Sequence, residues 1–372
     1  MRVGIMLRSL DEQGGIGVYS RYLTQELLAC DPDNAYILFY RSQSNLGRFQ
    51  NYPNAKELVV SAPNKMLWDQ VSIPLACRQE KVDVLLHPKF TVPLLAPCKT
   101  VMVLHGAGWF MPEFSKFWNK TDLKYVRLMM PVYIKKAAAV MSVSEITTET
   151  FNRVFNLTDG KIKTVYFGPG KHFRRIEDEN ILENVRRKYN LPDDFIFTLS
   201  GYDRGDRKNF KGILKAYKKH HGRTGHHLVV GGKDCDRFKI DYEIPDDGYG
   251  KDILFPGWIE QEDLPAFYSM ASVFLYPSNV EAFPIPITEA MACGTPIITS
   301  NANGLVEIVG DAAILVDPND PAEIAEALNR VLCDPGLSSA QSARALKRSE
   351  NFTWEKCARQ TLEILESVVS QR

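Results

Sequence analysis

One stretch in the second half of the sequence decides the expected fold, and it reads Glu281-Ala-Phe-Pro-Ile-Pro-Ile-Thr-Glu289-Ala-Met-Ala-Cys-Gly294-Thr-Pro-Ile-Ile-Thr299. Pro286 suits the first position of a helix, and Gly294 suits the residue just beyond a helix end. The apolar residues after Gly294, and the apolar run 273–276 before Glu281, are typical of buried strands. Strand, loop, helix and strand in this order predict an α/β crossover unit, whose helix N-terminus favours anions.

Two carboxylates occupy different places in this unit. Glu281 lies in the loop at the mouth of the predicted helix, and Glu289 lies about one turn inside it. A ligand that suits this arrangement carries both an anionic group and hydroxyl groups. A nucleotide diphosphate sugar has both.

The stretch closely resembles the Glu-x7-Glu motif of the retaining, metal-independent glycosyltransferases of family four (glycosyl transferases group 1). The resemblance implies the GT-B fold, in which two Rossmann-like, doubly wound α/β domains face each other across a cleft. It implies that Glu289 binds the ribose hydroxyls and that Glu281 is a catalytic residue near the donor sugar. The residues between them that would also contact the donor are Ala282, Phe283, Pro284 and Ile285.

The length of 372 residues predicts two domains, because single hydrophobic cores stop growing before that size. Two series of short apolar strands alternate with amphipathic segments, and Gly168-Pro-Gly170 interrupts the pattern, which predicts a hinge there. We therefore expect an N-terminal, acceptor-side domain at 1–168 and a nucleotide-sugar domain at 169–352. An amphipathic helix fills 353–372, and the resemblance implies that it packs back toward the N-terminal domain.

Composition excludes several classes of function. Lys and Arg together number 45, and so do Asp and Glu. The chain therefore lacks the net positive charge that would indicate a nucleic-acid partner. The seven cysteines include no Cys-x2-Cys pair, which favours thiols in a reducing compartment over a disulfide framework or a zinc site. No apolar run is long enough to cross a membrane. These features predict a cytoplasmic protein, which could also bind peripherally to the inner face of the plasma membrane.

A basic segment follows the first strand of the second series and includes Gly201, Tyr202, Arg204, Arg207 and Lys208. Cations at this strand end would neutralise a diphosphate. Lys208 matches the catalytic lysine of the family, which stands in an Arg-Lys-Asn or Arg-Lys-Gly run. Tyr202 stands where the family often has an arginine, so Arg204 or Arg207 would substitute, and Arg207 is favoured.

A glycine-rich segment, Gly14-Gly15-Ile16-Gly17, follows the first strand and opens the first helix. Glycines allow backbone N–H groups to approach an anion closely. The resemblance implies a loop that closes over the donor phosphates and borders the acceptor. The spacing is not Gly-x-Gly-x-x-Gly, which argues against a dinucleotide-binding oxidoreductase.

Two further positions come from the resemblance. His105 ends the strand at 100–104 and would form a catalytic hydrogen bond to the donor sugar or phosphate, although Gly106 replaces the aspartate usual in the family. Gly257-Trp-Ile259 follows another strand, and in the family the backbone here pairs with the base edge, so Ile259 is a donor-binding candidate.

Residues 109–136 hold six basic residues against two acidic ones, and Lys116, Lys120, Lys124 and Arg127 share one face of a predicted helix. This segment could contact anionic lipid headgroups or a lipid-linked acceptor. The alternative is a helix beside the acceptor cleft whose aromatic side chains pack inward. These aromatic residues are Trp109, Phe110, Phe114, Phe117, Trp118, Tyr125 and Tyr133.

The sequence therefore predicts a hexosyltransferase that uses a nucleotide-sugar donor and needs neither a metal ion nor a cofactor. It looks most similar to bacterial mannosyltransferases of polysaccharide assembly, so GDP-mannose is the first choice of donor and a UDP-sugar the second. The acceptor would be a hydroxyl group of a glycan or of a lipid-linked molecule. The remaining alternatives are an inverting or epimerase-type GT-B enzyme and a non-catalytic scaffold with this fold.

Overall fold

Strands and helices alternate along the chain, and the strands form two separate parallel sheets. The structure is a computed structural model that describes residues 1–11, 14–111, 115, 118–158, 160–202, 206–302 and 304–371. Arg204, Phe114, Phe117 and Lys116 lie outside the described residues. The chain divides into unit 1, Met1–Phe167 with Thr353–Arg372, and unit 2, Gly168–Phe352.

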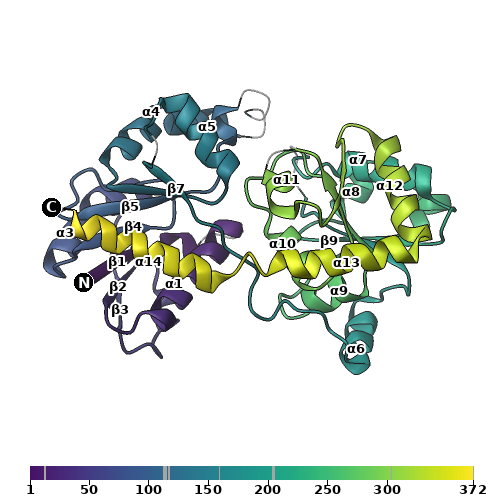
Figure 1. Cartoon of the computed structure of the whole chain (residues 1–372), viewed down its shortest axis with the longest axis horizontal. Coiled ribbons are helices and arrows are strands. Elements are labelled where there is room, and N and C mark those ends of the chain that lie inside the picture. The colour runs from purple at the N-terminus through teal and green to yellow at the C-terminus, as the bar shows by residue number, and fades with distance from the viewer. Residues whose placement is uncertain are drawn as a thin grey trace. The chain divides into compact units, whose positions relative to one another are not determined.

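Unit 1 is built on a seven-stranded sheet with the order β3-β2-β1-β4-β5-β6-β7 (Figure 1). Its strands are β1 Arg2–Met6, β2 Ala35–Tyr40, β3 Ala55–Val59, β4 Val84–His87, β5 Lys99–Leu104, β6 Ala139–Ser142 and β7 Ile162–Thr164. Its helical segments are η1 Arg8–Asp11, α1 Gly15–Cys30, η2 Gln43–Asn45, α2 Lys65–Leu67, the π-helical turn η3 Trp68–Ser72, α3 Ile73–Gln79, η4 Gly108–Phe110, α4 Lys120–Lys136, α5 Glu145–Phe155 and α14 Trp354–Ser370.

Unit 2 is built on a six-stranded sheet with the order β10-β9-β8-β11-β12-β13. Its strands are β8 Phe195–Leu199, β9 His227–Gly231, β10 Ile253–Gly257, β11 Val273–Tyr276, β12 Ile297–Ser300 and β13 Ile314–Val316. Its helical segments are α6 Glu179–Tyr189, α7 Phe210–His220, α8 Arg237–Asp241, η6 Gly248–Asp252, α9 Leu264–Met270, α10 Ile285–Ala292, α11 Gly304–Val309, α12 Pro321–Cys333 and α13 Pro335–Ser349.

Each sheet reverses its strand order once, and these points decide where ligands can bind. In unit 1 the order turns back between β1 and β4, and in unit 2 between β8 and β11. In open parallel sheets, ligands bind beyond the carboxyl ends of the strands at such a switch point. Two doubly wound α/β units, as the sequence predicted, thus supply one switch point each.

The strands are apolar because both faces of each sheet are covered. β2 has five successive buried residues, which is the pattern of a central parallel strand. On one face of the unit 1 sheet, α14 lies beside α1 (Figure 1). The Trp354 ring of α14 stacks on Phe167 at 4.9 Å and on Tyr22 at 5.4 Å, and meets Tyr19 edge-on at 5.5 Å. The last helix thus completes the hydrophobic core of unit 1.

None of the helices within the described ranges has the length and apolar character required to cross a bilayer.

Candidate active site

The loops that follow β8 and β11 are joined at the switch point of unit 2. Asn209 Nδ2 donates to the Pro277 carbonyl at 3.1 Å. The Arg207 carbonyl accepts from Ser278 Oγ at 3.1 Å and from the Asn279 amide at 2.9 Å. These bonds hold the basic segment against the loop that carries Glu281. Two regions that are 74 residues apart in sequence therefore form one site.

Glu281 is held by three donors on one carboxylate oxygen. Its Oε1 accepts from Arg207 Nη1 at 2.7 Å, from Tyr276 Oη at 2.8 Å and, more weakly, from Ser278 Oγ at 3.4 Å. The side chain is only 12% exposed. A carboxylate with a charged partner and hydroxyl donors is fixed in orientation. The carboxylate therefore stands in a set position at the strand end predicted for the donor sugar.

Lys208 lies next to Arg207 and just before Asn209, the N-cap of α7. Its Nζ donates to the Leu199 carbonyl at 3.2 Å and lies 5.5 Å from the centre of the Tyr276 ring. These contacts hold the ammonium group at the carboxyl end of β8. A cation placed there can stabilise charge that develops on a departing phosphate.

Glu289 is an acidic residue inside the protein. It is 5% exposed, and its Oε2 accepts a hydrogen bond from Tyr268 Oη at 3.0 Å. Burial raises the pKa of Glu289 to about 7, while the Tyr268 hydrogen bond and the charge of Lys208 act in the opposite direction. Hydrogen bonds from the hydroxyl groups of a ligand would replace the water that the Glu289 carboxylate loses on burial. They would thereby stabilise its ionised form.

Backbone amides and the apolar side chain of Phe283 lie at the N-terminus of α10. Its N-cap residue, Pro284, provides no capping side chain. The Ile287 amide already donates to the Pro284 carbonyl at 3.1 Å, whereas the Ile285 amide at the first residue of α10 stays a candidate for a phosphate contact. Phe283 is buried and its ring lies 5.9 Å from Phe352. A Cβ on Gly304 would lie 2.1 Å from the Ala282 carbonyl, so the loop after Glu281 passes close to α11.

The remaining predicted donor contacts of unit 2 lie at the ends of β8 and β10. The Gly201 backbone passes so close to Gly232 that a Cβ on Gly232 would lie 2.5 Å from the Gly201 nitrogen. Ile259 is buried, and its side chain packs over Gly231. Trp258 beside it is 61% exposed. The position predicted to contact the base therefore combines the buried side chain of Ile259 with the exposed ring of Trp258.

Tyr202, which replaces the usual arginine, faces α8. Its ring lies 5.4 Å from Phe238, the Arg237 guanidinium lies 4.4 Å from the ring centre, and its hydroxyl donates to Asp241. Among the residues of this loop that the structure describes, Arg207 is the arginine that contacts Glu281. Its Nη1 also donates to the Val280 carbonyl at 3.1 Å.

His105 and the glycine-rich segment belong to unit 1. Gly14 is the N-cap of α1, has φ of 122° and carries no capping side chain, and it is exposed together with Gly15. Ile16 and Gly17 occupy the first turn of α1 and are partly exposed. His105 follows β5, and its ring meets the Tyr19 ring of α1 edge-on at 4.7 Å. The histidine therefore lies next to the helix that this segment opens.

The protonation of His105 follows from its partner. Its Nε2 lies 3.0 Å from the Pro88 carbonyl, which can only accept, so Nε2 carries the proton and Nδ1 is the acceptor nitrogen. Burial lowers the pKa of His105 to about 4. A neutral imidazole with this tautomer can accept a hydrogen bond from a sugar hydroxyl through Nδ1.

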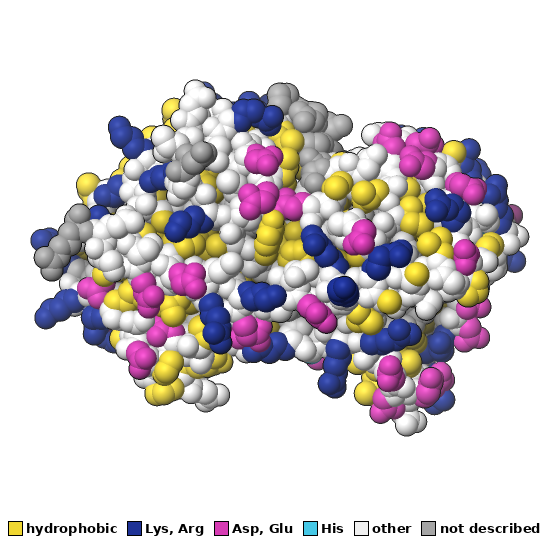
Figure 2. All heavy atoms as spheres, viewed as in Figure 1, with side chains coloured by type: hydrophobic (Ala, Val, Ile, Leu, Met, Phe, Trp, Pro, Cys, Tyr) yellow, Lys and Arg dark blue, Asp and Glu magenta, His cyan; other side chains and the backbone are white. Residues whose placement is uncertain are grey.

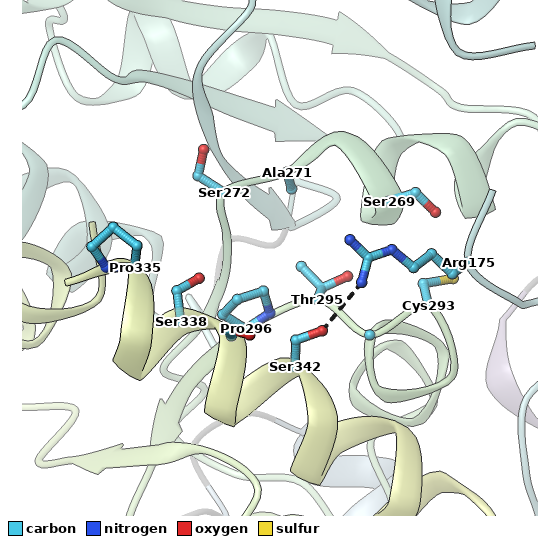
Figure 3. A pocket seen from close by; sticks show the side chains of 12 residues that line it. Arg175, Ser269, Ala271, Ser272, Cys293, Thr295, Pro296, Pro335, Ser338 and Ser342 are labelled. Carbon is cyan, nitrogen blue, oxygen red and sulfur yellow. Dashed lines mark hydrogen bonds between the residues drawn. The ribbon is translucent and has the colours of Figure 1, made fainter. Parts of the chain in front are cut away.

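A separate hollow of about 330 Å³ lies at the opposite end of the unit 2 sheet, where β11 and β12 begin. Figure 3 shows Arg175 pointing into it toward Ser342, with 3.5 Å between Nη1 and Oγ. Its remaining walls come from the ends of α9 and α10 and from α13. None of the predicted site residues lines it. Among the residues that the structure describes, no group of three or more His, Cys, Asp or Glu side chains could hold a metal ion.

Comparison with known proteins agrees with this geometry. Residues 182–348, within unit 2, match the family described as Glycosyl transferases group 1. Over 377 aligned residues the chain is 27% identical to O-antigen chain mannosyltransferase B of Escherichia coli, and the match covers 94% of each protein. Together these matches support a group 1 glycosyltransferase.

A further mannosyltransferase and two solved structures are also similar to this glycosyltransferase. Serotype-specific mannosyltransferase WbdA of Escherichia coli is 25% identical over 281 residues, which are 72% of this chain and 33% of WbdA. Sucrose-phosphate synthase of Thermosynechococcus elongatus superposes with a TM-score of 0.78 at 21% identity, covering 100% of both chains. HepE of Anabaena, solved with UDP and glucose, has a TM-score of 0.78 at 16% identity, covering 99% of this chain and 100% of HepE. These structures confirm the predicted GT-B fold.

Sequence reasoning missed the residues that hold the two glutamates of this glycosyltransferase. Tyr276 and Ser278 donate to Glu281, and Tyr268 donates to Glu289. The segment Tyr276-Pro-Ser278 before Glu281 was visible as a strand end, but its donor role was not deduced. Tyr268 is too distant in sequence for a local pattern to connect it with Glu289.

Proposed function

We propose that this glycosyltransferase moves mannose from GDP-mannose to a hydroxyl group of a glycan or lipid-linked acceptor, with retention of the anomeric configuration. It would use neither a metal ion nor a resident cofactor. The choice of mannose is supported by the 27% identity with an O-antigen chain mannosyltransferase over 94% of the chain. The observation that carries the proposal is the switch point of unit 2, where Arg207 holds Glu281 and Lys208 lies close enough to influence Glu289.

The donor would bind along the carboxyl ends of β8, β10 and β11. Glu289 would accept the ribose hydroxyls, and the backbone at Ile259 would meet the base. Lys208, with the Phe283 and Ile285 amides, would neutralise the diphosphate. Arg207 would keep Glu281 oriented toward the sugar, because its guanidinium already pairs with that carboxylate. In unit 1, the amides of Gly14 and Gly15 would contact the phosphates, and His105 the sugar.

The proposed chemistry is a same-face substitution at the anomeric carbon. The bond between C1 and the β-phosphate oxygen breaks, and a bond between C1 and the acceptor oxygen forms on the same face. The acceptor proton moves to the departing phosphate oxygen, so GDP leaves as the protonated diphosphate. Each group that neutralises this oxygen could contribute roughly 2–4 kcal/mol in the transition state.

The acceptor side of the proposal includes peripheral contact with the cytoplasmic face of a membrane. The exposed face of α4 carries Leu128 and Val132, which are 69% and 43% exposed. Lys124, Arg127 and Lys135 are exposed on the same helix. Figure 2 shows basic and hydrophobic side chains next to each other over the area that α4 occupies in Figure 1. Such a combination suits an interface with anionic headgroups, where a lipid-linked acceptor would be presented.

Donor binding and turnover test the proposal together. Thermal-shift assays with GDP, UDP and ADP should give the largest increase in melting temperature with GDP, because a ligand of the native state stabilises it. With GDP-mannose and a mannosylated acceptor, free GDP should be released in the presence of EDTA. NMR of the product should show an α-mannoside. A larger increase in melting temperature with UDP would indicate that the donor is a UDP-sugar. A β-linked product would show that the anomeric configuration is not retained.

A further inference from the structure

Unit 1 contains a buried polar network that the proposed chemistry does not use directly. It consists of Arg8, Asp69, Thr91 and His87, which are 7%, 5%, 3% and 0% exposed. Arg8 follows β1, Asp69 lies in the π-helical turn η3, and His87 ends β4, which pairs with β1 at the switch point. π-helical turns are rare and frequently occur at functional sites. The network therefore lies under the ligand edge of the unit 1 sheet.

Asp69 is the centre of this network. Arg8 donates to both carboxylate oxygens, from Nε to Oδ1 at 2.8 Å and from a terminal nitrogen to Oδ2 at 3.1 Å. Thr91 Oγ1 donates to the same Oδ2 at 2.9 Å. A buried ion pair contributes little net stability compared with apolar residues of the same size. A better-supported reason for a protein to retain a buried ion pair is that the pair fixes one conformation.

The hydrogen bonds allow one arrangement of protons. His87 Nδ1 lies 2.6 Å from the Thr91 carbonyl, which can only accept, so Nδ1 carries the proton. The Thr91 hydroxyl gives its proton to Asp69 and can accept from the same Nδ1 at 3.0 Å. The loop 88–91 is thus held at its far end by the Thr91 side chain and backbone.

This loop contains the carbonyl that orients His105. The Pro88 carbonyl accepts from His105 Nε2 at 3.0 Å, and Pro88 directly follows His87. The Lys89 carbonyl next to it accepts from the Val103 amide at 3.2 Å, and Thr91 with Asp69 holds the far end of the loop. Without the Thr91 hydroxyl, the loop would lose its bond to Asp69, and the Pro88 carbonyl could move away from His105.

We propose that Asp69, acting through Thr91 and the 88–91 loop, is a positioning residue that sets the ring orientation and the tautomer of His105. The inference rests on the proposed function, because it gives His105 the task of accepting a hydrogen bond through Nδ1. Asp69 and Thr91 are fully engaged with each other and with Arg8 and His87. They act on the reaction through His105.

The variant Thr91→Val tests this, because it removes the hydroxyl and keeps the shape of the side chain. We expect kcat to fall roughly 10- to 100-fold, as for a misplaced catalytic group, while the donor KM stays within about twofold. Nitrogen-15 NMR of His105 should show the Nε2-protonated tautomer in the wild type and a mixture of tautomers in the variant. Thr91→Ser, which restores the hydroxyl, should return both kcat and the NMR signature to wild-type values.

A matched control is Thr150→Val in α5. Thr150 is also buried, but its hydroxyl bonds to the Ile146 carbonyl of its own helix, and the variant should keep wild-type kcat and the His105 tautomer. Asp69→Asn is the second variant, since it keeps the volume and should give the same change as Thr91→Val.

An unchanged His105 tautomer in Thr91→Val and Asp69→Asn would overturn the inference even if kcat fell. The NMR comparison requires no turnover. Absence of transfer in the wild type would therefore reject the proposed function and leave the positioning role to be decided separately.

Discussion

The two glutamates of the motif differ in what surrounds them. Glu281 has a guanidinium and two hydroxyl donors on one oxygen, so its charge is neutralised and its direction is fixed. Glu289 is buried with one tyrosine hydroxyl, and burial raises its pKa to about 7. One carboxylate is therefore held in place by its partners, while burial disfavours the ionised form of the other and hydroxyl donors from a ligand would favour it.

At the residue scale, donor affinity should depend on pH through Glu289. The ionised carboxylate accepts ribose hydroxyls, and the folded-state pKa of about 7 lies above the usual value of 4.5, so affinity for GDP should increase as pH rises from 6 to 8. The same raised pKa stabilises the folded chain below pH 4.5, and this contribution is lost as pH rises through 7. Glu289→Gln should bind GDP with little dependence on pH, and Glu289→Ala should raise the donor KM roughly 10- to 100-fold.

Calorimetric titration of GDP at three pH values would measure this dependence. Glu307→Gln, a change of the same kind on α11, is the control and should keep the wild-type pH profile. A Glu289→Ala variant with wild-type donor affinity would refute the ribose role.

Lys208 should affect turnover more than binding. Its ammonium group lies at the end of β8, where it would stabilise charge on the leaving diphosphate, so Lys208→Ala should lower kcat by roughly 100-fold or more. Steady-state kinetics separate this effect from a smaller change in donor KM. Lys211→Ala, on the exposed side of α7, should retain wild-type turnover. A Lys208→Ala enzyme as fast as the wild type would remove Lys208 from the site.

At the scale of elements, α4 shows how a sequence pattern can be correct while its interpretation changes. Tyr133 is buried, and Trp109, Phe110 and Tyr125 pack against the same core, so these aromatic side chains point inward. The exposed apolar residues of the helix are instead Leu128 and Val132. The proposed membrane contact therefore depends on two aliphatic residues and their basic neighbours.

Vesicle binding tests this face of α4. The double variant Leu128→Ser/Val132→Ser should reduce co-sedimentation with phosphatidylglycerol vesicles. Removal of Lys124 and Arg127 should weaken binding by about 1 kcal/mol for each charge at low salt. Ile181→Ser changes an exposed apolar residue of α6 and serves as the control. Equal binding of the wild type to neutral and anionic vesicles would contradict the role of the basic residues.

At the scale of the whole molecule, the interior of unit 1 depends on a helix that follows unit 2 in the sequence. Trp354 of α14 is 2% exposed and contacts three aromatic rings of unit 1. Trp354→Ala should therefore destabilise unit 1 by about 3–5 kcal/mol. Denaturant unfolding should show an earlier transition for unit 1 and an unchanged one for unit 2. Trp258→Ala, which removes an exposed tryptophan, should change neither by more than about 0.5 kcal/mol. A common shift of both transitions would show that the units do not unfold separately.

The sequence allowed the strands and both doubly wound sheets to be predicted, because strands covered on two faces must be nearly continuous apolar runs. It did not allow the Arg207–Glu281 ion pair to be predicted, because that contact depends on side-chain directions in two loops far apart in sequence. The network at Asp69 was missed for the same reason. The amphipathic pattern at 353–372 correctly predicted a helix with one buried face, which includes Trp354, Ile364 and Leu365.

The position of α14 also has a consequence for biosynthesis. A ribosome delivers all of unit 2 before the helix that covers Tyr19 and Phe167 emerges. During translation, unit 2 can therefore reach its final state while an apolar surface of unit 1 is still uncovered. Such a nascent surface is a binding place for chaperones, and it closes only once Trp354 has left the exit tunnel.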